Sequence, residues 1–335
     1  MNNRAVGNFA CAPLLALALA LPAPSGAQTP TDEAVPSSSF QASPQDSLVA
    51  SLHLPADTAD RLSQALGRRD YLSAEKLLLP EIDRDPHSVR AARLLAFIGV
   101  IYFRNQDYPN AVVAWNKSEA ITPLGTDLRF SLAMAYIHIG HPDWARPVLE
   151  SLASENPKDA LYPYWLGRLD YDSHLYPEAT RRFQQAVELN PQMARAYDNL
   201  GLCYYYQNQN DRAVTSYQKA IQLDAASQHP SPWPYLNLAI TQQFLNQLPD
   251  AEKNLRQAIR LAPDLAKAHF QLGIVLGHLH RLDETLAELR EAARLDPSYA
   301  EPHMAMARVL QKLGQEAPAR EEVQTYLRLH SHSTP

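Results

Sequence analysis

The chain has 335 residues, of which 46% are apolar and 20% are charged, and its formal net charge is −6. A nucleic-acid-binding role is disfavoured, because phosphate recognition needs a basic face. The chain has two cysteines, Cys11 and Cys203, and if the first 27 residues are cleaved only Cys203 remains, so no intramolecular disulfide is possible.

The first segment, residues 1–27, has the pattern of an export signal. Arg4 supplies a positive start, residues 9–21 form an apolar run, and residues 25–27 are small, as signal peptidase requires. A membrane anchor needs about 20 apolar residues, so this run is too short to be one. We therefore expect cleavage and a periplasmic or secreted mature chain, whose charge becomes −7 because Arg4 is lost with no acid.

Two alternatives for this segment stay open: a disordered apolar tail and a lipid-acceptor site at Cys11. A lipid-acceptor cysteine closes its apolar stretch, whereas here most of the stretch follows Cys11, which disfavours lipidation. Residues 28–54 are rich in Ser, Pro, Thr and Gln and contain few large apolar residues. Such a composition predicts a disordered tether.

From residue 55 onward, prolines recur at a fixed interval, at Pro123, Pro157 and Pro191, and again at Pro263 and Pro297. The longer interval between Pro191 and Pro263 equals two such periods plus a short insertion. A period of about 34 residues predicts stacked helical hairpins, each made of two antiparallel amphipathic helices.

Small residues recur within most units, once on each predicted helix; the first unit has Leu62 and the unit from Ala266 has Thr285 at such a place. In the unit from Ala194, Gly201 and Ala213 are expected to face each other, so that the two backbones approach closely. Asp211, with Asp143 and Asp283 at the same place, is expected to cap the second helix. The small positions are Gly99, Ala111, Ala133, Ala145, Gly167, Ala179, Gly201, Ala213, Ala239, Ala251, Gly273, Ala307 and Ala319.

These positions resemble the tetratricopeptide repeat, whose consensus has a large residue, Leu, Gly, Ala, an aromatic residue, Ala and Pro in the same register. The unit from Ala194 matches it with Tyr197, Leu200, Gly201, Ala213, Tyr217 and Ala220. The resemblance covers about 280 of the 335 residues and implies an all-α, right-handed solenoid over 55–335. We expect about eight units, beginning near residues 55, 92, 126, 160, 194, 232, 266 and 300.

The resemblance also implies that the first helices line a concave face. The second, fifth, sixth, ninth, twelfth and thirteenth residues of each unit then project inward. Three successive sixth residues are carboxamides, and a row of them can pair with the backbone of an extended peptide. The predicted peptide-binding residues are Asn199, Asn237, Gln271, Tyr164, Trp165, Arg168, Tyr171, Arg195, Tyr205, Tyr206, Phe244, Lys267 and Phe270.

A second interpretation of these residues is structural. Asn is common at the sixth position of the repeat consensus, and aromatic residues also pack between hairpins. A clamp for a carboxyl terminus is not indicated, because the fifth and ninth positions lack paired Lys and Asn; the unit from Ala194 has Asp198 and Leu202 there.

Catalysis finds no support in the motifs, since the sequence has no phosphate loop, nucleophile elbow, HExxH or CxxC. We predict no cofactor and no metal site. His278 with His280, and His330 with His332, are too closely spaced to share a helix face. The sequence therefore predicts a noncatalytic protein- or peptide-binding scaffold.

Two further roles stay open. One is self-assembly through the last unit, where Val323, Tyr326 and Leu327 are predicted to leave an apolar edge without a covering helix. The other is docking of a separate enzyme, which would use the same inner surface.

Overall fold

The computed structural model describes residue 49 and residues 52–332. The predicted signal and residues 28–48, 50 and 51 of the predicted tether lie outside the described residues. Within the described range the chain forms sixteen helices and no strand. They pair as α2 (Ala56–Gly67) with α3 (Tyr71–Asp83), α4 (Val89–Arg104) with α5 (Tyr108–Glu119), α6 (Thr126–His138) with α7 (Pro142–Glu155), α8 (Leu161–Asp172) with α9 (Tyr176–Leu189), α10 (Ala194–Tyr206) with α11 (Asn210–Asp224), α12 (Trp233–Phe244) with α13 (Leu248–Leu261), α14 (Ala266–His278) with α15 (Leu282–Leu295), and α16 (Glu301–Lys312) with α17 (Glu316–His332).

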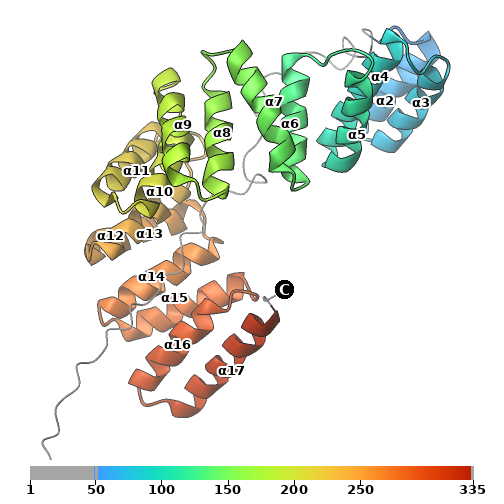
Figure 1. Cartoon of the computed structure of the whole chain (residues 1–335). Coiled ribbons are helices and arrows are strands. Elements are labelled where there is room, and N and C mark those ends of the chain that lie inside the picture. Colours follow the sequence, from blue (N-terminus) through green and yellow to red (C-terminus); the bar gives the residue numbers. More distant parts are fainter. Residues whose placement is uncertain (1–48, 50–51, 333–335) are drawn as a thin grey trace, which may run out of the picture.

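The hairpins stack side by side along an open arc, with α2 and α3 at one end and α16 and α17 at the other (Figure 1). First helices of successive hairpins contact one another at most junctions: α4 with α6, α8 with α10, α10 with α12, α12 with α14 and α14 with α16. No two successive second helices in the described range make comparable contact. The first helices therefore lie on the inner side of the arc, and the predicted all-α solenoid is confirmed.

Helix starts follow the predicted period closely in the middle of the array. α6, α10 and α14 begin at residues 126, 194 and 266. α4 instead begins at Val89, upstream of the predicted unit start at residue 92, because the Ser88 hydroxyl accepts a hydrogen bond from the Ala91 amide at 3.1 Å. This capping bond satisfies one of the amides that a helix leaves unpaired at its start, so the helix extends upstream.

The glycines expected at the close approach of the two helices each lie against a large side chain of the second helix. A Cβ at Gly99 would lie 2.3 Å from Trp115 Nε1, and one at Gly201 would lie 2.5 Å from the Tyr217 ring. Gly167 on α8 faces the Phe183 ring on α9 in the same way. Glycine therefore makes room for a large side chain of the second helix.

The aspartates expected to cap the second helices lie two residues past the cap. Asp211 and its equivalents Asp143 and Asp283 are in the first turn of their helices, and the N-cap residues there are Gln209, His141 and Arg281, none with a side-chain capping bond. These carboxylates act through the positive end of the helix dipole, so their contribution is about 0.3–1 kcal/mol at an exposed site.

Every hairpin turn contains one residue in the left-handed backbone region. Two of the eight are glycine, Gly140 and Gly314; the others, with φ between 56° and 61°, are Arg69, Gln106, His174, Asn208, Asn246 and His280. In the fifth hairpin the Asn208 amide donates to Tyr205 O at 2.9 Å and the Gln209 amide to Tyr204 O at 2.8 Å. This pattern ends each first helix and reverses the chain.

Replacing His280 by glycine is expected to stabilise the seventh hairpin by about 0.5–1 kcal/mol. His280 has a φ of 61° and an exposed side chain, so glycine removes the steric cost of that conformation without loss of packing. Thermal unfolding followed by circular dichroism would show a higher midpoint for His280→Gly. His280→Ala keeps the strain and should melt no higher than the wild type; equal gains for both would contradict this account.

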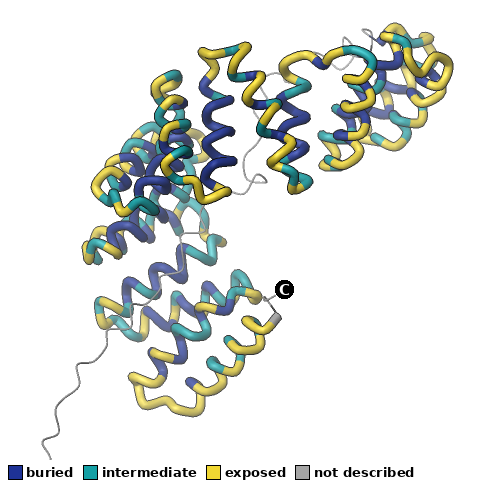
Figure 2. The backbone as a smooth tube through the Cα atoms, in the orientation of Figure 1, coloured by how far each residue is buried: buried dark blue, intermediate teal, exposed yellow. Residues whose placement is uncertain are grey.

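Burial concentrates on the first helices, as Figure 2 shows, while the outer faces of the second helices are exposed. α8 is the extreme case, with every residue from Tyr162 to Tyr171 buried. Between α7 and α8 the guanidinium of Arg146 lies 2.8 Å from the carboxylate of Asp170, which is almost fully buried. This ion pair joins the third hairpin to the fourth.

A row of polar groups along the inner helices

The three predicted carboxamides lie on successive inner helices, Asn199 on α10, Asn237 on α12 and Gln271 on α14, and all three are buried. Trp165 occupies the same register position on α8, so the row has four members. We call Trp165, Asn199, Asn237 and Gln271 the sixth-position row. The sequence interpretation placed Trp165 among the groove aromatics and missed its place in this row, although its register position was the available signal.

The amide nitrogens of the two asparagines are already bonded. Asn199 Nδ2 donates to the Arg195 carbonyl at 2.8 Å, and Asn237 Nδ2 donates to Asp198 Oδ1 at 3.1 Å, which ties α12 to α10. These two bonds hold both side chains in one orientation and leave each amide oxygen as the atom still to be accounted for.

Three buried polar atoms of the row have no hydrogen-bond partner: Trp165 Nε1, Asn199 Oδ1 and Asn237 Oδ1. A buried polar group without a partner costs about 1–3 kcal/mol, so such atoms are rare in folded proteins. One donor and two acceptors thus lie at the same register position of three successive inner helices, each shielded from solvent in this structure.

Aromatic rings border the row toward the hairpin turns. Tyr206 stacks on Tyr176 with ring centroids 4.6 Å apart, and Tyr171 meets Tyr206 edge-on at 5.9 Å. Tyr205 extends the cluster to Phe244 on α12, at 6.3 Å. Burial raises the pKa of Tyr171, Tyr205 and Tyr206, so their hydroxyls stay protonated at neutral pH. Phe244 is 53% exposed and presents its ring at the edge of this cluster.

The predicted cations differ in their surroundings. The Arg195 guanidinium lies 4.6 Å from the ring centroid of Tyr164, a cation–π contact that fastens α10 to α8. Burial lowers the pKa of Lys267 to about 8, and Glu301 partly opposes this shift. Phe270, near Lys267 on α14, packs on Tyr299 with centroids 5.2 Å apart.

The predicted residues thus share one face but not one degree of exposure. Only Phe244 is exposed, and Arg195, Tyr205, Tyr206 and Lys267 are half-buried. The buried ones are Tyr164, Trp165, Arg168, Tyr171, Asn199, Asn237, Phe270 and Gln271. The same side chains therefore pack the array and line its inner face. The Tyr164 ring is an example, since its centroid lies 5.8 Å from that of Phe183.

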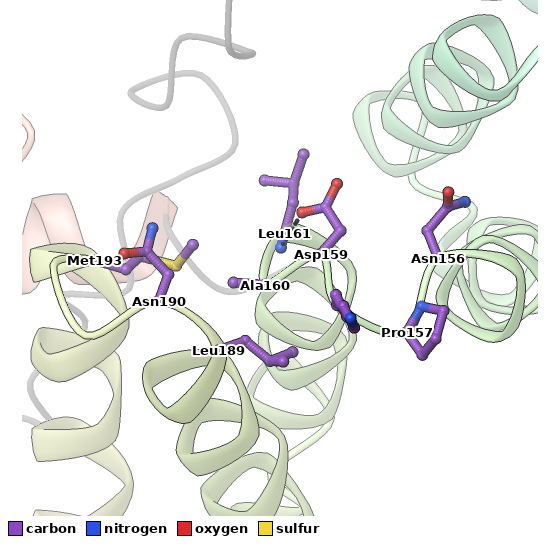
Figure 3. A pocket seen from close by; sticks show the side chains of 9 residues that line it. Asn156, Pro157, Asp159, Ala160, Leu161, Leu189, Asn190 and Met193 are labelled. Atoms are coloured by element: carbon purple, nitrogen blue, oxygen red, sulfur yellow. Dashed lines mark hydrogen bonds between the residues drawn. The ribbon is translucent and has the colours of Figure 1, made fainter.

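A separate hollow of about 830 Å³ lies at the connections between hairpins (Figure 3). Its lining residues are Asn156, Pro157, Lys158, Asp159, Ala160, Leu161, Leu189, Asn190 and Met193. Asp159 Oδ1 accepts from the Leu161 amide at 2.9 Å, and Asn156 Nδ2 donates to Leu152 O at 3.2 Å. Because these polar groups already serve the helix ends, the hollow lacks the convergent polar atoms of a ligand site.

The seventh hairpin contains a histidine–carboxylate pair outside the row. His269 Nδ1 lies 2.7 Å from Glu288 Oε2, and its Nε2 lies 3.1 Å from Pro263 O. The hydrogen bond with Glu288, chiefly, raises the pKa of His269 above its ordinary value of 6.5. The protonated form is therefore favoured in the folded chain.

This pair predicts a pH dependence. Its stabilisation is fully present below pH 6.5, the ordinary value, and is lost as pH rises through the raised pKa of folded His269. The urea midpoint of the wild type should therefore fall, relative to that of His269→Gln, as pH increases from mildly acidic to mildly alkaline. A constant difference between the two proteins across that range would show that the pair does not titrate as described.

The described part of the chain offers little else that resembles a reactive centre. No three His, Cys, Asp or Glu side chains in it gather into a group that could hold a metal ion. Cys203 on α10 is buried as predicted, and burial raises the pKa of its thiol to about 12. None of the helices in this range is both long and apolar enough to cross a membrane.

Two relatives among known proteins match parts of this chain. Peroxisome biogenesis protein 5 of Arabidopsis thaliana is 29% identical over 157 residues, which cover 46% of this chain and 21% of that protein. The BBSome complex member BBS4 homolog of Drosophila melanogaster is 23% identical over 183 residues, 52% of this chain and 36% of that protein. The chain thus spans about a fifth and about a third of their lengths.

Solved structures share the fold. A tetratricopeptide repeat protein from Parabacteroides merdae ATCC 43184 superposes with a TM-score of 0.60 at 15% identity, covering 76% of this chain and 98% of its own. The Cut9–Hcn1 hetero-tetramer of APC/C gives 0.59 at 18% identity, covering 74% and 48%. PilW, a type IV pilus biogenesis factor, gives 0.54 at 19% identity, covering 59% and 90%.

Family models for the tetratricopeptide repeat match residues 61–126 and 236–300 in one case and residues 192–264 in the other. Together these ranges span just over half of the chain, and they fall on the hairpins described above. With its regular proline period, its paired antiparallel helices and these matches, the chain belongs to the tetratricopeptide repeat family.

Proposed function

We propose that this protein binds an extended peptide segment of a partner protein along its inner helices, without catalysing a reaction. Proteins of this repeat family act in protein interactions and are generally noncatalytic scaffolds, and the family matches are to repeat models. The relatives fit this class, since one of them is named as a member of a multiprotein complex.

The observation that carries the proposal is the set of unpaired atoms in the sixth-position row. Because these atoms are buried, peptide binding would require the inner helices to separate enough to expose them; Trp165 Nε1 would then donate to a peptide carbonyl, and the amide oxygens of Asn199 and Asn237 would accept from peptide N–H groups. Backbone bonds of this kind give affinity without a strict sequence requirement. The rings of Tyr205, Tyr206 and Phe244 lie beside the row and would select apolar or aromatic side chains.

The proposal is tested by affinity capture with the triple variant Asn199→Ala, Asn237→Ala, Gln271→Ala. We expect this variant to lose most of the partner that the wild type recovers, because two of the three unpaired atoms and the third carboxamide of the row are removed together. Peptides tiled over the captured protein should then bind the wild type at least tenfold more tightly than the triple variant. A kept helical circular dichroism spectrum shows that the variant is folded.

A matched control removes an amide from the opposite side of the array. Gln185 lies on α9, a second helix, and its side chain is exposed, so Gln185→Ala should leave capture and peptide affinity unchanged. Equal recovery by the wild type and the triple variant would remove the row from the binding site.

We propose that the protein is exported and cleaved near residue 27, and that the mature chain is periplasmic or secreted. The support is the sequence of residues 1–27, with its positive start, apolar run and small residues before the cleavage point. Amino-terminal sequencing of the protein purified from an exported fraction would identify the first residue. An intact residue 1 in that fraction would argue against cleavage.

Self-assembly through the last hairpin is a second candidate, supported by Leu327, which is 58% exposed on α17. One difference between the last hairpin and the earlier ones argues against self-assembly. The equivalent of Tyr326 in earlier hairpins is a fully buried alanine, Ala220 in the fifth and Ala258 in the sixth, so a further hairpin cannot dock in the same register. Light scattering distinguishes the two roles. A concentration-dependent oligomer that Leu327→Asp abolishes would favour assembly. A monomer would favour the peptide-binding role.

A further inference from the structure

We infer that a hollow between the first hairpin and α4 binds a small aliphatic carboxylate. The hollow has a volume of about 560 Å³, within the range of about 300–1,000 Å³ that is usual for small-molecule pockets. It lies at the end of the arc formed by α2, α3 and α4 (Figure 1), whereas the sixth-position row lies on α8 to α14. The inference therefore goes beyond peptide binding by the row and does not require it.

The floor of the hollow is apolar and firmly packed. Leu66 from α2, with Phe97 and Ile101 from α4, lines it, and all three are buried in the core that the first hairpin shares with α4. Val100, which is half-buried, lines it as well. These side chains carry no polar atom, so they can cover a short methylene chain and remove it from water.

Two guanidinium groups add positive charge to this apolar floor. Arg69 in the first hairpin turn and Arg104 at the end of α4 both line the hollow, and no acid is among its described lining residues. Guanidinium groups bind carboxylates in a planar, two-pronged geometry that neither an alcohol nor an amine can reproduce. An apolar floor beside two arginines therefore fits a ligand with an apolar chain and a single carboxylate.

The acids that are closest in sequence to these arginines serve helix ends. Asp70 accepts from the Ser73 amide at 3.1 Å and caps α3, and Asp107 accepts from the Asn110 amide at 3.3 Å and caps α5. Asp70 lines a separate hollow on the other side of the turn. Neither carboxylate lines the hollow in question, so its charge stays positive.

The first hairpin turn does not itself require an arginine. The Arg69 amide donates to Leu66 O at 3.0 Å and the residue has a φ of 56°, which is the pattern of every turn in the array. Gln106 takes the equivalent place in the second hairpin with a φ of 61°. A glutamine is therefore accommodated by this turn, and Arg69→Gln removes the charge without altering the backbone.

A ligand in this hollow would contact the first hairpin and α4 together. Of the described helices, only α4 makes substantial contact with this hairpin, through α3. Such a ligand would strengthen that junction, because a molecule that binds only the packed form stabilises it by mass action. Binding would therefore be visible as a local gain in stability of α2 and α3.

The first test compares octanoate with two probes that have the same chain, octylamine and 1-octanol, by isothermal titration calorimetry on the full chain. Octanoate should bind at least tenfold more tightly than either probe, because only its head group pairs with guanidinium. Equal affinities for the three probes would show apolar contact alone and would overturn the inference.

The second test removes the charges. Arg69→Gln and Arg104→Gln should each weaken octanoate binding, and together they should weaken it about tenfold or more, with the helical circular dichroism spectrum kept. Arg68→Gln is the matched control, since Arg68 is the neighbouring residue but lines the separate hollow. Octanoate binding that the double variant leaves intact, or that Arg68→Gln weakens equally, would place the ligand elsewhere and refute the site.

The third test locates the bound ligand. Amide hydrogen exchange of the full chain should slow in α2 and α3 when octanoate is added, and exchange in α16 and α17 at the other end should not change. No slowing in α2 and α3, or slowing of the same size at both ends, would contradict binding in this hollow.

Discussion

Gly99→Ala is expected to destabilise the second hairpin by about 2–4 kcal/mol, the largest effect that the structure predicts for the loss of a single glycine. Its new Cβ would lie 2.3 Å from Trp115 Nε1, the donor of a 3.0 Å hydrogen bond to Ala96 O. The fully buried indole has no space to retreat, so either the helices separate or the bond is lost. Urea unfolding followed by circular dichroism would measure the change.

Gly67→Ala is the matched control, because a Cβ there meets nothing within 4 Å. Alanine is the better helix former, so this variant should be equal in stability to the wild type or gain up to about 1 kcal/mol. Similar unfolding curves for Gly99→Ala and Gly67→Ala would show that Trp115 can move aside, and would contradict the packing described between α4 and α5.

The second large effect concerns the ion pair between the third and fourth hairpins. Arg146→Met leaves the carboxylate of Asp170 buried without its cation, and we expect a loss of about 3–5 kcal/mol in the free energy of unfolding. Arg181→Met is the control, since Arg181 pairs with Glu178 at the surface and its removal should cost less than about 1 kcal/mol.

A double variant separates two contributions to the free energy of unfolding: the penalty of burying an unpaired charge and the stabilisation from the ion pair. Arg146→Met combined with Asp170→Leu removes both charges, so it should be more stable than Arg146→Met alone. If the double variant were the less stable of the two, burial of the unpaired carboxylate would not be the cause. The three proteins can be compared in one urea series, with binding of the captured partner as a check on the fold.

The repeat architecture was readable from the sequence because its signal is long-range. A single period, repeated along the chain, sets the helix pairs, and prolines such as Pro157 and Pro191 mark their ends. Local details were less accessible. Six of the eight hairpin turns use a non-glycine residue with positive φ, for example Asn208, and nothing in a single side chain announces that backbone conformation.

The candidate site was readable only in part, for a physical reason. Register places Asn199 and Asn237 on one face, but the partner of each amide depends on how one hairpin is rotated against the next. That rotation gives Asn237 Nδ2 a partner in Asp198 and leaves its Oδ1 without one. Packing within a hairpin likewise decides that the Tyr217 ring lies directly against Gly201, a contact that register alone does not specify.

The position of the sixth-position row within the array affects how early it is lost when the protein unfolds. Contacts in this chain join each hairpin to its immediate neighbours, so unfolding can begin at either end and proceed inward. α8 to α14 are protected on one side by three hairpins and on the other by the last one. During heating or proteolysis from the ends, the binding surface would therefore be lost only after the terminal hairpins.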